Sequence, residues 1–371
     1  MTVVATFAIS GYPVVFGDLL MTGPSANEVR TVAVPAQGEV QEFFGDSGWS
    51  VLGLKQKVTL LADNCVVAWA GSLLGARIAI SGLRELAKTG VLTCESILRH
   101  LQADSDLSKH PASFVGMVAE SGRLHQFRFN AEHFDSTTLG HVFLSGSGSA
   151  AIHEFSKVLA SMESRSTGSA NAAVTCVAKT MMLGGMLLQA EFRGGLAATT
   201  LRNMFGGGYE IAFFSDGRMR KLEEVSYLFW EAEIAPDEVR VSPPQLVVKQ
   251  RYIGDYLLIR SARIEASAKQ LRVENEQRHV ICPMYDAPSL DVPMEELRTI
   301  SLQSNLLCHC ILVLQAGQQT GIYTMVQRYS PESEVTITFE DKDDQVVIGF
   351  RSDTMTQIAQ SLERFRNGTP G

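Results

Sequence analysis

The amino-acid sequence predicts an α+β fold in which two β-sheets lie between pairs of helices, followed by a module built mainly of strands. Up to about residue 235 the apolar patterns come in blocks: strands, two helices, strands, two helices, strands. Segregated blocks are typical of layered α+β architectures, whereas a parallel doubly wound sheet needs alternating strands and helices. Beyond Pro243 and Pro244 nearly every pattern is that of a strand. We therefore expect two domains, residues 1–235 and 244–371.

Length and composition agree with two globular domains. The chain has 371 residues, of which 45% are hydrophobic and 19% are charged. Single cores seldom grow beyond about 250 residues, and this composition argues against disorder. The formal net charge of -8 provides no basic surface for nucleic acid or for an anionic membrane. Neither is expected as a partner.

The sequence also indicates a cytoplasmic location. The N-terminal region lacks the basic start of a secretory signal, and its apolar stretches are interrupted by Gly11, Pro13 and Asp18. We find no apolar run of the roughly 20 residues that a membrane-spanning helix needs. The six cysteines are scattered without the spacing of a disulfide framework, so reduced thiols are expected.

The first block begins with a hairpin. Residues 2–9 alternate as a strand does, a turn follows at residues 10–13, and the strand pattern resumes at residues 14–16. Residues 21–50 are rich in Gly, Pro and acidic side chains and are interpreted as an insert with one short strand, at 31–34. Further strands of the first domain are expected at 57–61, 65–69, 114–119, 124–129, 142–144, 209–214 and 225–232.

Four helices are expected among these strands, at residues 73–87, 93–103, 150–161 and 170–192. The second of them should be capped by the Thr93 side chain, with Ser96 in the position where a glutamate would complete a capping box. The β-rich module should end in an amphipathic helix at residues 353–366. Its apolar face combines Met355, Ile358, Leu362 and Phe365 and should cover the module's own sheet.

The strands expected in the module are 246–251, 256–264, 271–274, 279–284, 306–315, 322–328, 334–340 and 345–350. No residues within it have the spacing of a nucleophile, a base and an orienting group. A role in assembly or partner recognition is therefore expected.

The segment Cys308-His309-Cys310 could suggest a metal site, but it lies in an apolar run, residues 306–314, that is typical of a buried strand. A second ligand pair is missing. His100, His110, His125, His133 and His153 show no metal spacing either. We expect no metal and no cofactor.

The residues at the N-terminus could carry chemistry. A threonine becomes an effective nucleophile when a free α-amine, with a pKa near 8, accepts its hydroxyl proton. Removal of Met1 would expose Thr2, and a hairpin turning at residues 10–12 would bring Asp18 back beside it. Taken alone, Asp18 could equally belong to an ordinary turn, Lys57 to a solvated strand end, and residues 146–148 to a flexible turn.

Several short segments occur in the order in which a known family carries them. Thr2-Val3-Val4 with Gly17-Asp18, Gln56-Lys57-Val58, Val67-Ala68-Trp69-Ala70-Gly71 and Ser145-Gly146-Ser147-Gly148-Ser149 resemble the signature segments of proteasome β subunits and bacterial HslV-type ring peptidases. The resemblance extends from about Thr2 to Trp230. It implies the four-layer αββα sandwich of N-terminal-nucleophile (Ntn) hydrolases.

The resemblance also implies roles for individual residues. Thr2 would be the nucleophile and its α-amine the general base. Asp18 would orient Lys57, whose ammonium lowers the proton affinity of the hydroxyl and the amine, and Ser147 would relay the proton. The backbone N–H of Ala68, at a position that looks like the family's usual glycine, would stabilise the oxyanion.

Two further positions are expected to support the site. Active family members often carry an Asp and a Ser just before the last core strand, where this chain offers Asn203 and Gly206. Asn203 and Gly148 are therefore supporting candidates, and the departures at Asn203, Gly206 and Ala68 count against activity.

The function implied by the resemblance is that of a threonine peptidase. It would hydrolyse peptides or unfolded proteins inside a self-compartmentalising homo-oligomer, such as a ring. Two alternatives remain: a catalytically inactive scaffold or interaction protein that kept the fold, and an amidase that acts on a small molecule.

Overall fold

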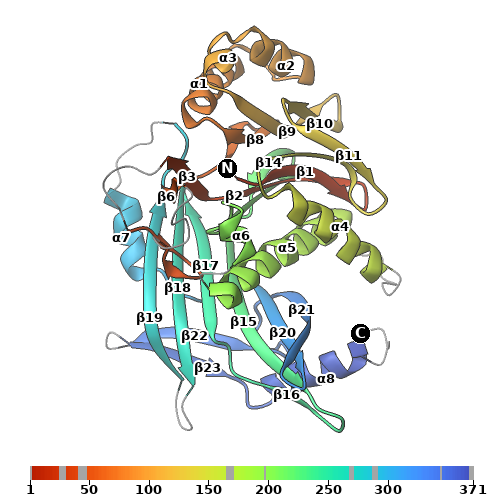
Figure 1. Cartoon of the computed structure of the whole chain (residues 1–371), viewed down its shortest axis with the longest axis vertical. Coiled ribbons are helices and arrows are strands. Elements are labelled where there is room, and N and C mark those ends of the chain that lie inside the picture. Colours follow the sequence, from red (N-terminus) through yellow and green to blue (C-terminus); the bar gives the residue numbers. More distant parts are fainter. Residues whose placement is uncertain are drawn as a thin grey trace.

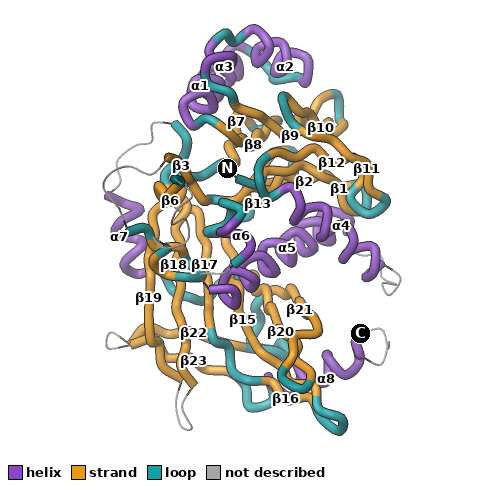
Figure 2. Tube along the Cα trace, in the orientation of Figure 1, coloured by secondary structure: helices purple, strands orange, loops and turns teal. Residues whose placement is uncertain are grey.

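The computed structural model describes residues 2–24, 31–40, 48–163, 171–195, 198–266, 271–285, 291–342 and 345–366. Within them the chain forms a mixed α+β protein with several antiparallel sheets and eight helices (Figures 1 and 2). The expected α+β class is confirmed. Residues 25–30 and 41–47, which belong to the expected insert, lie outside the described residues.

The six-stranded sheet is built around the N-terminal hairpin. Its strand order is β11-β12-β1-β2-β13-β14. The hairpin turns at Ser10 and Gly11, both with positive φ, and its register places Val4 opposite Gly17. The strands are β1 (Val4–Ile9), β2 (Tyr12–Asp18), β11 (Glu132–Ser136), β12 (Gly140–Ser145), β13 (Tyr209–Ser215) and β14 (Arg218–Lys221).

A four-stranded sheet packs against one face of the six-stranded sheet. Its order is β10-β9-β8-β7, with β7 (Val58–Ala62), β8 (Cys65–Gly71), β9 (Ala112–Glu120) and β10 (Arg123–Phe129). Side chains on alternate positions of a strand point to opposite faces. Accordingly Val4 and Val15 pack between the two sheets with Val58 and Val66, whereas Ala5 and Phe7 point to the other side.

Helices cover the outer faces of both sheets. The four-stranded sheet packs against α1 (Leu73–Thr89), α2 (Cys94–Ala103) and α3 (Asp106–Lys109). Thr93 and Ser96 form the complete capping box of α2. The six-stranded sheet is covered by α4 (Ser149–Glu163) and α5 (Ala172–Gly194), as Figure 1 shows.

Helix α5 lies between two sheets. One side packs on β1 and β2. The other packs on a further sheet of seven strands, where Gly185 allows close approach to Cys310 of strand β20 (Leu306–Gln315). By length and composition α5 is apolar enough to cross a membrane, a property that the sequence analysis did not find, and half of its most apolar stretch is buried in this fold. A helix that is covered on both sides needs an apolar surface nearly all round.

The seven-stranded sheet has the order β19-β18-β17-β15-β20-β21, and β16 pairs with β15. β15, expected to complete the first domain, runs antiparallel to β17 and parallel to β20. The hydrogen bonds of this sheet therefore cross the boundary expected between residues 235 and 244. The strands are β15 (Glu224–Ile234), β16 (Val239–Val241), β17 (Leu246–Ile253), β18 (Tyr256–Ala266), β19 (Leu271–Ile281), β20 (Leu306–Gln315) and β21 (Gln318–Arg328).

The last elements pack on the face of the seven-stranded sheet away from α5. β22 (Ile337–Lys342) and β23 (Gln345–Phe350) form a hairpin, and α8 (Thr354–Arg366) follows. Ile358 and Leu362 of α8 share a core with Leu228 and Trp230 of β15. The helix thus covers a sheet as expected, but that sheet includes β15, which the sequence analysis assigned to the first domain. The Phe365 side chain lies outside the described residues.

Sequence patterns missed several short elements. The expected strands at 271–274 and 279–284 form one strand, β19, and the helix α7 (Asp291–Thr299) was not predicted. The insert contributes β3 (Leu20–Pro24), β4 (Ala33–Val34), β5 (Gly38–Glu39) and β6 (Trp49–Leu54), and α6 (Thr199–Arg202) precedes β13.

Candidate functional site

The structure brings Thr2, Asp18 and Lys57 together, and we call these three residues the Asp18 cluster. The hydroxyl of Thr2 donates to Asp18 Oδ1 and accepts a hydrogen bond from Lys57 Nζ. Lys57 Nζ lies 2.7 Å from Asp18 Oδ1 and donates to the carbonyl oxygen of Leu20 at 2.6 Å. The exposed fractions of the three residues are 2%, 0% and 1%. The ammonium therefore touches the hydroxyl in a site that excludes most water.

Backbone amides fix the Asp18 carboxylate. Oδ1 accepts the N–H of Val3 at 2.9 Å, and Oδ2 accepts the N–H groups of Gly206 at 2.8 Å and Leu20 at 3.3 Å. A buried carboxylate is tolerated when its charge is paired and its oxygens accept hydrogen bonds. Asp18 meets both conditions, so its orientation toward Thr2 and Lys57 is set by the chain itself.

Burial lowers the pKa of the Lys57 ammonium below its ordinary value, and the adjacent Asp18 carboxylate offsets this effect only in part. An ammonium in contact with a hydroxyl lowers the proton affinity of that hydroxyl, and such an electrostatic effect is stronger in a buried site than in water.

Glycines let the segment after β12 approach the backbone of Thr2. Gly148 donates its N–H to the carbonyl oxygen of Thr2 at 3.0 Å. A Cβ on Gly148 would lie 2.6 Å from Cβ of Val3, and a Cβ on Gly146, which has φ +105°, would clash with the Thr2 carbonyl. Only glycine fits such close contacts without displacement. The support expected from Gly148 is thus a backbone contact.

Ser147 and Asn203 meet each other rather than the Thr2 hydroxyl. The Ser147 hydroxyl donates to the backbone carbonyl of Asn203. In the same segment it is Gly206, through its N–H on Asp18, that contacts the Asp18 cluster. The sequence indicated only side chains as candidates at these positions, and it gave no signal for the backbone N–H of Gly206 as a donor.

The place of Ala68 does not suit the oxyanion role expected for it. Ala68 is fully buried in the middle of β8 and is paired with Val58 on one side and Val115 on the other. Trp69 N–H donates to Lys57 O at 3.2 Å. Because successive residues of an antiparallel strand direct their N–H groups to opposite neighbours, the Ala68 N–H faces Val115 and belongs to the ladder.

A second buried carboxylate holds the backbone of Lys57. Glu210 Oε2 accepts the N–H groups of Lys57 at 2.6 Å and Val58 at 2.9 Å. Its Oε1 accepts from Lys221 Nζ at 2.8 Å and from the Tyr252 hydroxyl at 2.7 Å. Glu210 alternates with apolar residues in β13 and is 1% exposed. A glutamate at a buried position of a strand is the sequence signal that could have revealed it.

Gln56, next to Lys57, extends this arrangement to the seven-stranded sheet. Its amide nitrogen donates to the carbonyls of Asp255 at 2.7 Å and Ile281 at 2.8 Å, and its amide oxygen accepts from Lys221 at 2.8 Å. We call Gln56, Glu210, Lys221 and Tyr252 the Glu210 cluster. It ties the main chain around Lys57 to strands that begin more than 180 residues later in the chain.

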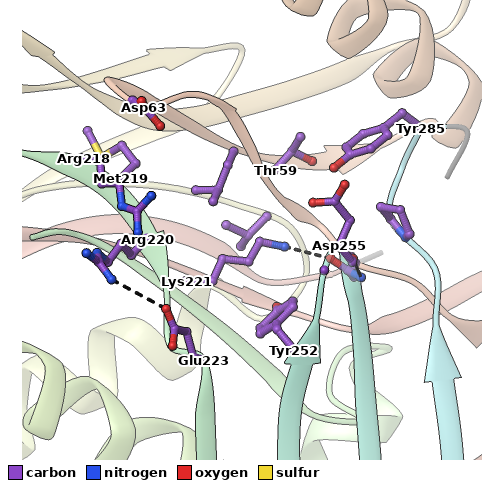
Figure 3. Close-up of a pocket in the computed structure, with 15 residues that line it drawn as sticks. Thr59, Asp63, Arg218, Met219, Arg220, Lys221, Glu223, Tyr252, Asp255 and Tyr285 are labelled. Atoms are coloured by element: carbon purple, nitrogen blue, oxygen red, sulfur yellow. Dashed lines mark hydrogen bonds and ion pairs between the residues drawn. The ribbon is translucent and has the colours of Figure 1, made fainter. Parts of the chain in front are cut away.

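A cavity of about 240 Å³ opens onto the Glu210 cluster. Figure 3 shows Lys221 crossing it toward Asp255, with Tyr252 below and Arg218, Arg220 and Glu223 on the opposite side. Thr2 and Asp18 are not among the residues that line it. This cavity therefore lies on the supporting side of Lys57 and not at the Thr2 hydroxyl.

Glu191 is buried beside the loop that holds Asp18. It accepts the Tyr209 hydroxyl at 2.8 Å and the Gly207 N–H at 3.2 Å. Burial raises the pKa of Glu191 to about 8. At neutral pH the carboxyl group is therefore mainly protonated, which avoids a second negative charge close to Asp18.

The segment Cys308-His309-Cys310 is a buried strand, as the sequence predicted. His309 Nδ1 accepts the indole N–H of Trp230 at 3.1 Å, and burial lowers the pKa of His309 to about 3. Cys308 and Cys310 pack in the core with α5. His133, in contrast, lies close to Asp135 and His141.

No family model matches the chain, and no curated protein is significantly similar to it in sequence.

Proposed function

We propose that the protein is an Ntn hydrolase of the threonine type that cleaves peptide bonds. The observation that carries this proposal is the direct contact of a buried lysine ammonium with the Thr2 hydroxyl, with Asp18 joined to both. A hydroxyl held by an ammonium is easier to deprotonate, and in an Ntn hydrolase the α-amine of the same residue accepts the proton.

In the proposed reaction, removal of Met1 frees the α-amine of Thr2. The amine takes the hydroxyl proton, Oγ1 attacks the carbonyl carbon, and the amine returns the proton to the leaving nitrogen. A water molecule activated by the same amine then hydrolyses the acyl-enzyme ester. Lys57 stabilises the negative charge that develops on Oγ1, and Asp18 keeps Lys57 in place.

The arrangement of layers supports the same proposal. Helices α1 to α3, the four-stranded sheet, the six-stranded sheet and helices α4 and α5 follow one another. We propose that this is the αββα sandwich of the Ntn hydrolases, and that the seven-stranded sheet is an addition packed on α5.

The oxyanion donor needs to be reassigned within this proposal. Gly71 ends β8, is exposed and has φ +95°. Trp69 and Gly71 are two residues apart in β8, so their N–H groups point toward the same neighbouring strand. The Trp69 N–H binds the carbonyl of Lys57, just before β7 begins at Val58, and the Gly71 N–H therefore points to that side as well. We propose the N–H of Gly71, rather than that of Ala68, as the oxyanion donor.

The test is covalent labelling at Thr2. Protein that mass spectrometry shows to begin at Thr2 is incubated with an epoxyketone or a β-lactone, and the modified residue is identified by peptide mapping. We expect one adduct, on Thr2, and none in Thr2→Ala. Absence of an adduct on a chain that lacks Met1 would overturn the proposal.

A second candidate function is that of a non-catalytic scaffold with the same fold. The observation that favours it is the 2% exposure of Thr2, because a nucleophile has to be reached by its substrate. Determination of the mature N-terminus separates the two candidates, since a chain that retains Met1 has no Thr2 amine to act as base. A third candidate, a small-molecule amidase, would label at Thr2 but would leave a peptide library uncut.

We further propose that the protein acts in the cytoplasm as a homo-oligomer, such as a ring, that shields its nucleophiles from folded proteins. Light scattering at working concentration tests this point. A monomeric mass would contradict it without bearing on Thr2 labelling.

A further inference from the structure

A hairpin at the edge of the six-stranded sheet carries three side chains that together resemble a metal-binding set. His133 and Asp135 are two residues apart on β11, so they share one face, and Asp135 is directly opposite His141 on β12. Asp135 Oδ1 lies 3.2 Å from His133 Nε2 and 2.6 Å from His141 Nδ1. One ligand atom from each residue thus lies within 4.8 Å of the other two.

This spacing is close to that of ligands around one ion. Zinc bonds of about 2.0 to 2.2 Å to imidazole nitrogen and carboxylate oxygen, at tetrahedral angles, separate neighbouring ligand atoms by about 3.3 Å. His133 and Asp135 already have this spacing, and Asp135 and His141 would have to move apart by about 0.7 Å to reach it. Two imidazoles and one carboxylate are a donor set that suits Zn²⁺, Cu²⁺ and Ni²⁺.

The ladder between β11 and β12 holds the three Cα positions at the required spacing before any ion binds. The side chains are also accessible, because His133, Asp135 and His141 are 32%, 69% and 73% exposed. Among the residues that the structure describes, no other three His, Cys, Asp or Glu side chains converge in this way.

We propose that His133, Asp135 and His141 form a surface site for a divalent transition-metal ion, Zn²⁺ in the first place. Each imidazole binds the ion through one neutral ring nitrogen. Three protein ligands leave a coordination position for water. The proposal is independent of the activity proposed for Thr2.

The test is isothermal titration of untagged, chelator-treated full-length protein with zinc chloride at pH 7.5. We expect one saturable site per chain that His141→Ala and Asp135→Asn each weaken by about tenfold or more, since even the loss of a group behind a ligand costs that much. His125→Ala, on the neighbouring sheet, is the matched control and should bind as the unaltered protein does.

Thermal melting of each variant shows whether it is folded, and Asp135→Asn preserves the shape of the side chain if His141→Ala does not fold. Zinc held by cysteines instead would bind equally to all variants. Such equal binding, or no saturable binding to the unaltered protein, would overturn the proposal.

Discussion

Lys57 is held from two sides by two buried carboxylates that serve it differently. Asp18 binds its ammonium and the Thr2 hydroxyl, whereas Glu210 binds its backbone N–H and that of Val58. Asp18 comes from the hairpin that also carries Thr2, while Glu210 is 153 residues away from Lys57 and is itself bound by Tyr252 of the seven-stranded sheet. Thr2 and Asp18 are thus brought together locally, whereas the support of Lys57 comes from distant parts of the chain.

The largest effect should follow a change of Lys57 itself. Lys57→Met keeps the length of the side chain but removes the charge beside Thr2, so the rate of Thr2 labelling by a β-lactone should fall by about 10² to 10⁴, the usual contribution of proton-transfer catalysis. Lys157→Met, on the surface of α4, is the control. Equal labelling rates in the two variants would show that Lys57 does not activate Thr2.

Glu210→Gln tests the carboxylate that holds the backbone of Lys57. The amide cannot accept all four hydrogen bonds and leaves the largely buried Lys221 ammonium with Gln56 but without a charged partner, which should cost about 3 kcal/mol of unfolding free energy. Thr2 labelling should fall less than in Lys57→Met, because the ammonium stays near the hydroxyl. Urea denaturation measures the unfolding free energy, and the labelling rate measures the reactivity of Thr2. The exposed Glu223→Gln is the control for both measurements. Unchanged stability would mean that Glu210 does not support Lys57.

Glu191, which is buried beside the loop that holds Asp18, should make the stability of the folded protein depend on pH. Its pKa is raised to about 8 in the folded protein but should lie near 4.5 when unfolded, so between these values the folded state holds the proton that the unfolded state has lost. The contribution of Glu191 to stability should therefore be fullest below about pH 4.5 and should fall by at most about 1.4 kcal/mol per pH unit up to about pH 8. Glu191→Gln should remove this slope in urea denaturation series, and a slope that persists would contradict it.

Tyr252→Phe should give the smallest effect. It removes one hydroxyl from Glu210, which still has three donors, and should cost about 1 kcal/mol of stability. If the seven-stranded sheet positions Lys57, Thr2 labelling should also slow measurably, whereas Tyr329→Phe should leave the rate unchanged. Slowing of the same size in both variants would indicate a general loss of stability rather than positioning.

Local patterns predicted most of the elements around Thr2. The hairpin of β1 and β2, the capped helix α2, and helices α4 and α5 lie close to their expected positions, because each depends on turn chemistry, caps or an apolar period within a short window. The hairpin alone accounts for the meeting of Thr2 and Asp18.

What local patterns missed depends on contacts between distant parts of the chain. β15 has an ordinary strand pattern, and nothing within it shows that its partners are β17 and β20 rather than the sheets around Thr2. Likewise, His133 and His141 are brought together only by the register of the hairpin of β11 and β12. The hydrogen bond from the Gly206 N–H to Asp18 could not be predicted either, because every residue type except proline has a backbone N–H. A chain ending at Ala235 would lose all three partners of β15, which are β16, β17 and β20, as well as Tyr252.

The long-range origin of the Glu210 cluster has a consequence for biosynthesis. Thr2 is synthesised long before the partners of this cluster. Gln56 donates to the carbonyls of Asp255 and Ile281, and Glu210 accepts from the hydroxyl of Tyr252, and all three of these partners come late in the chain. These contacts cannot form before residues 252–281 have been synthesised, and contacts of such sequence separation form slowly. A growing chain therefore carries Thr2 for most of its synthesis without a fully supported lysine beside it, and the hydrolase that we propose would become active only when most of the polypeptide has been made.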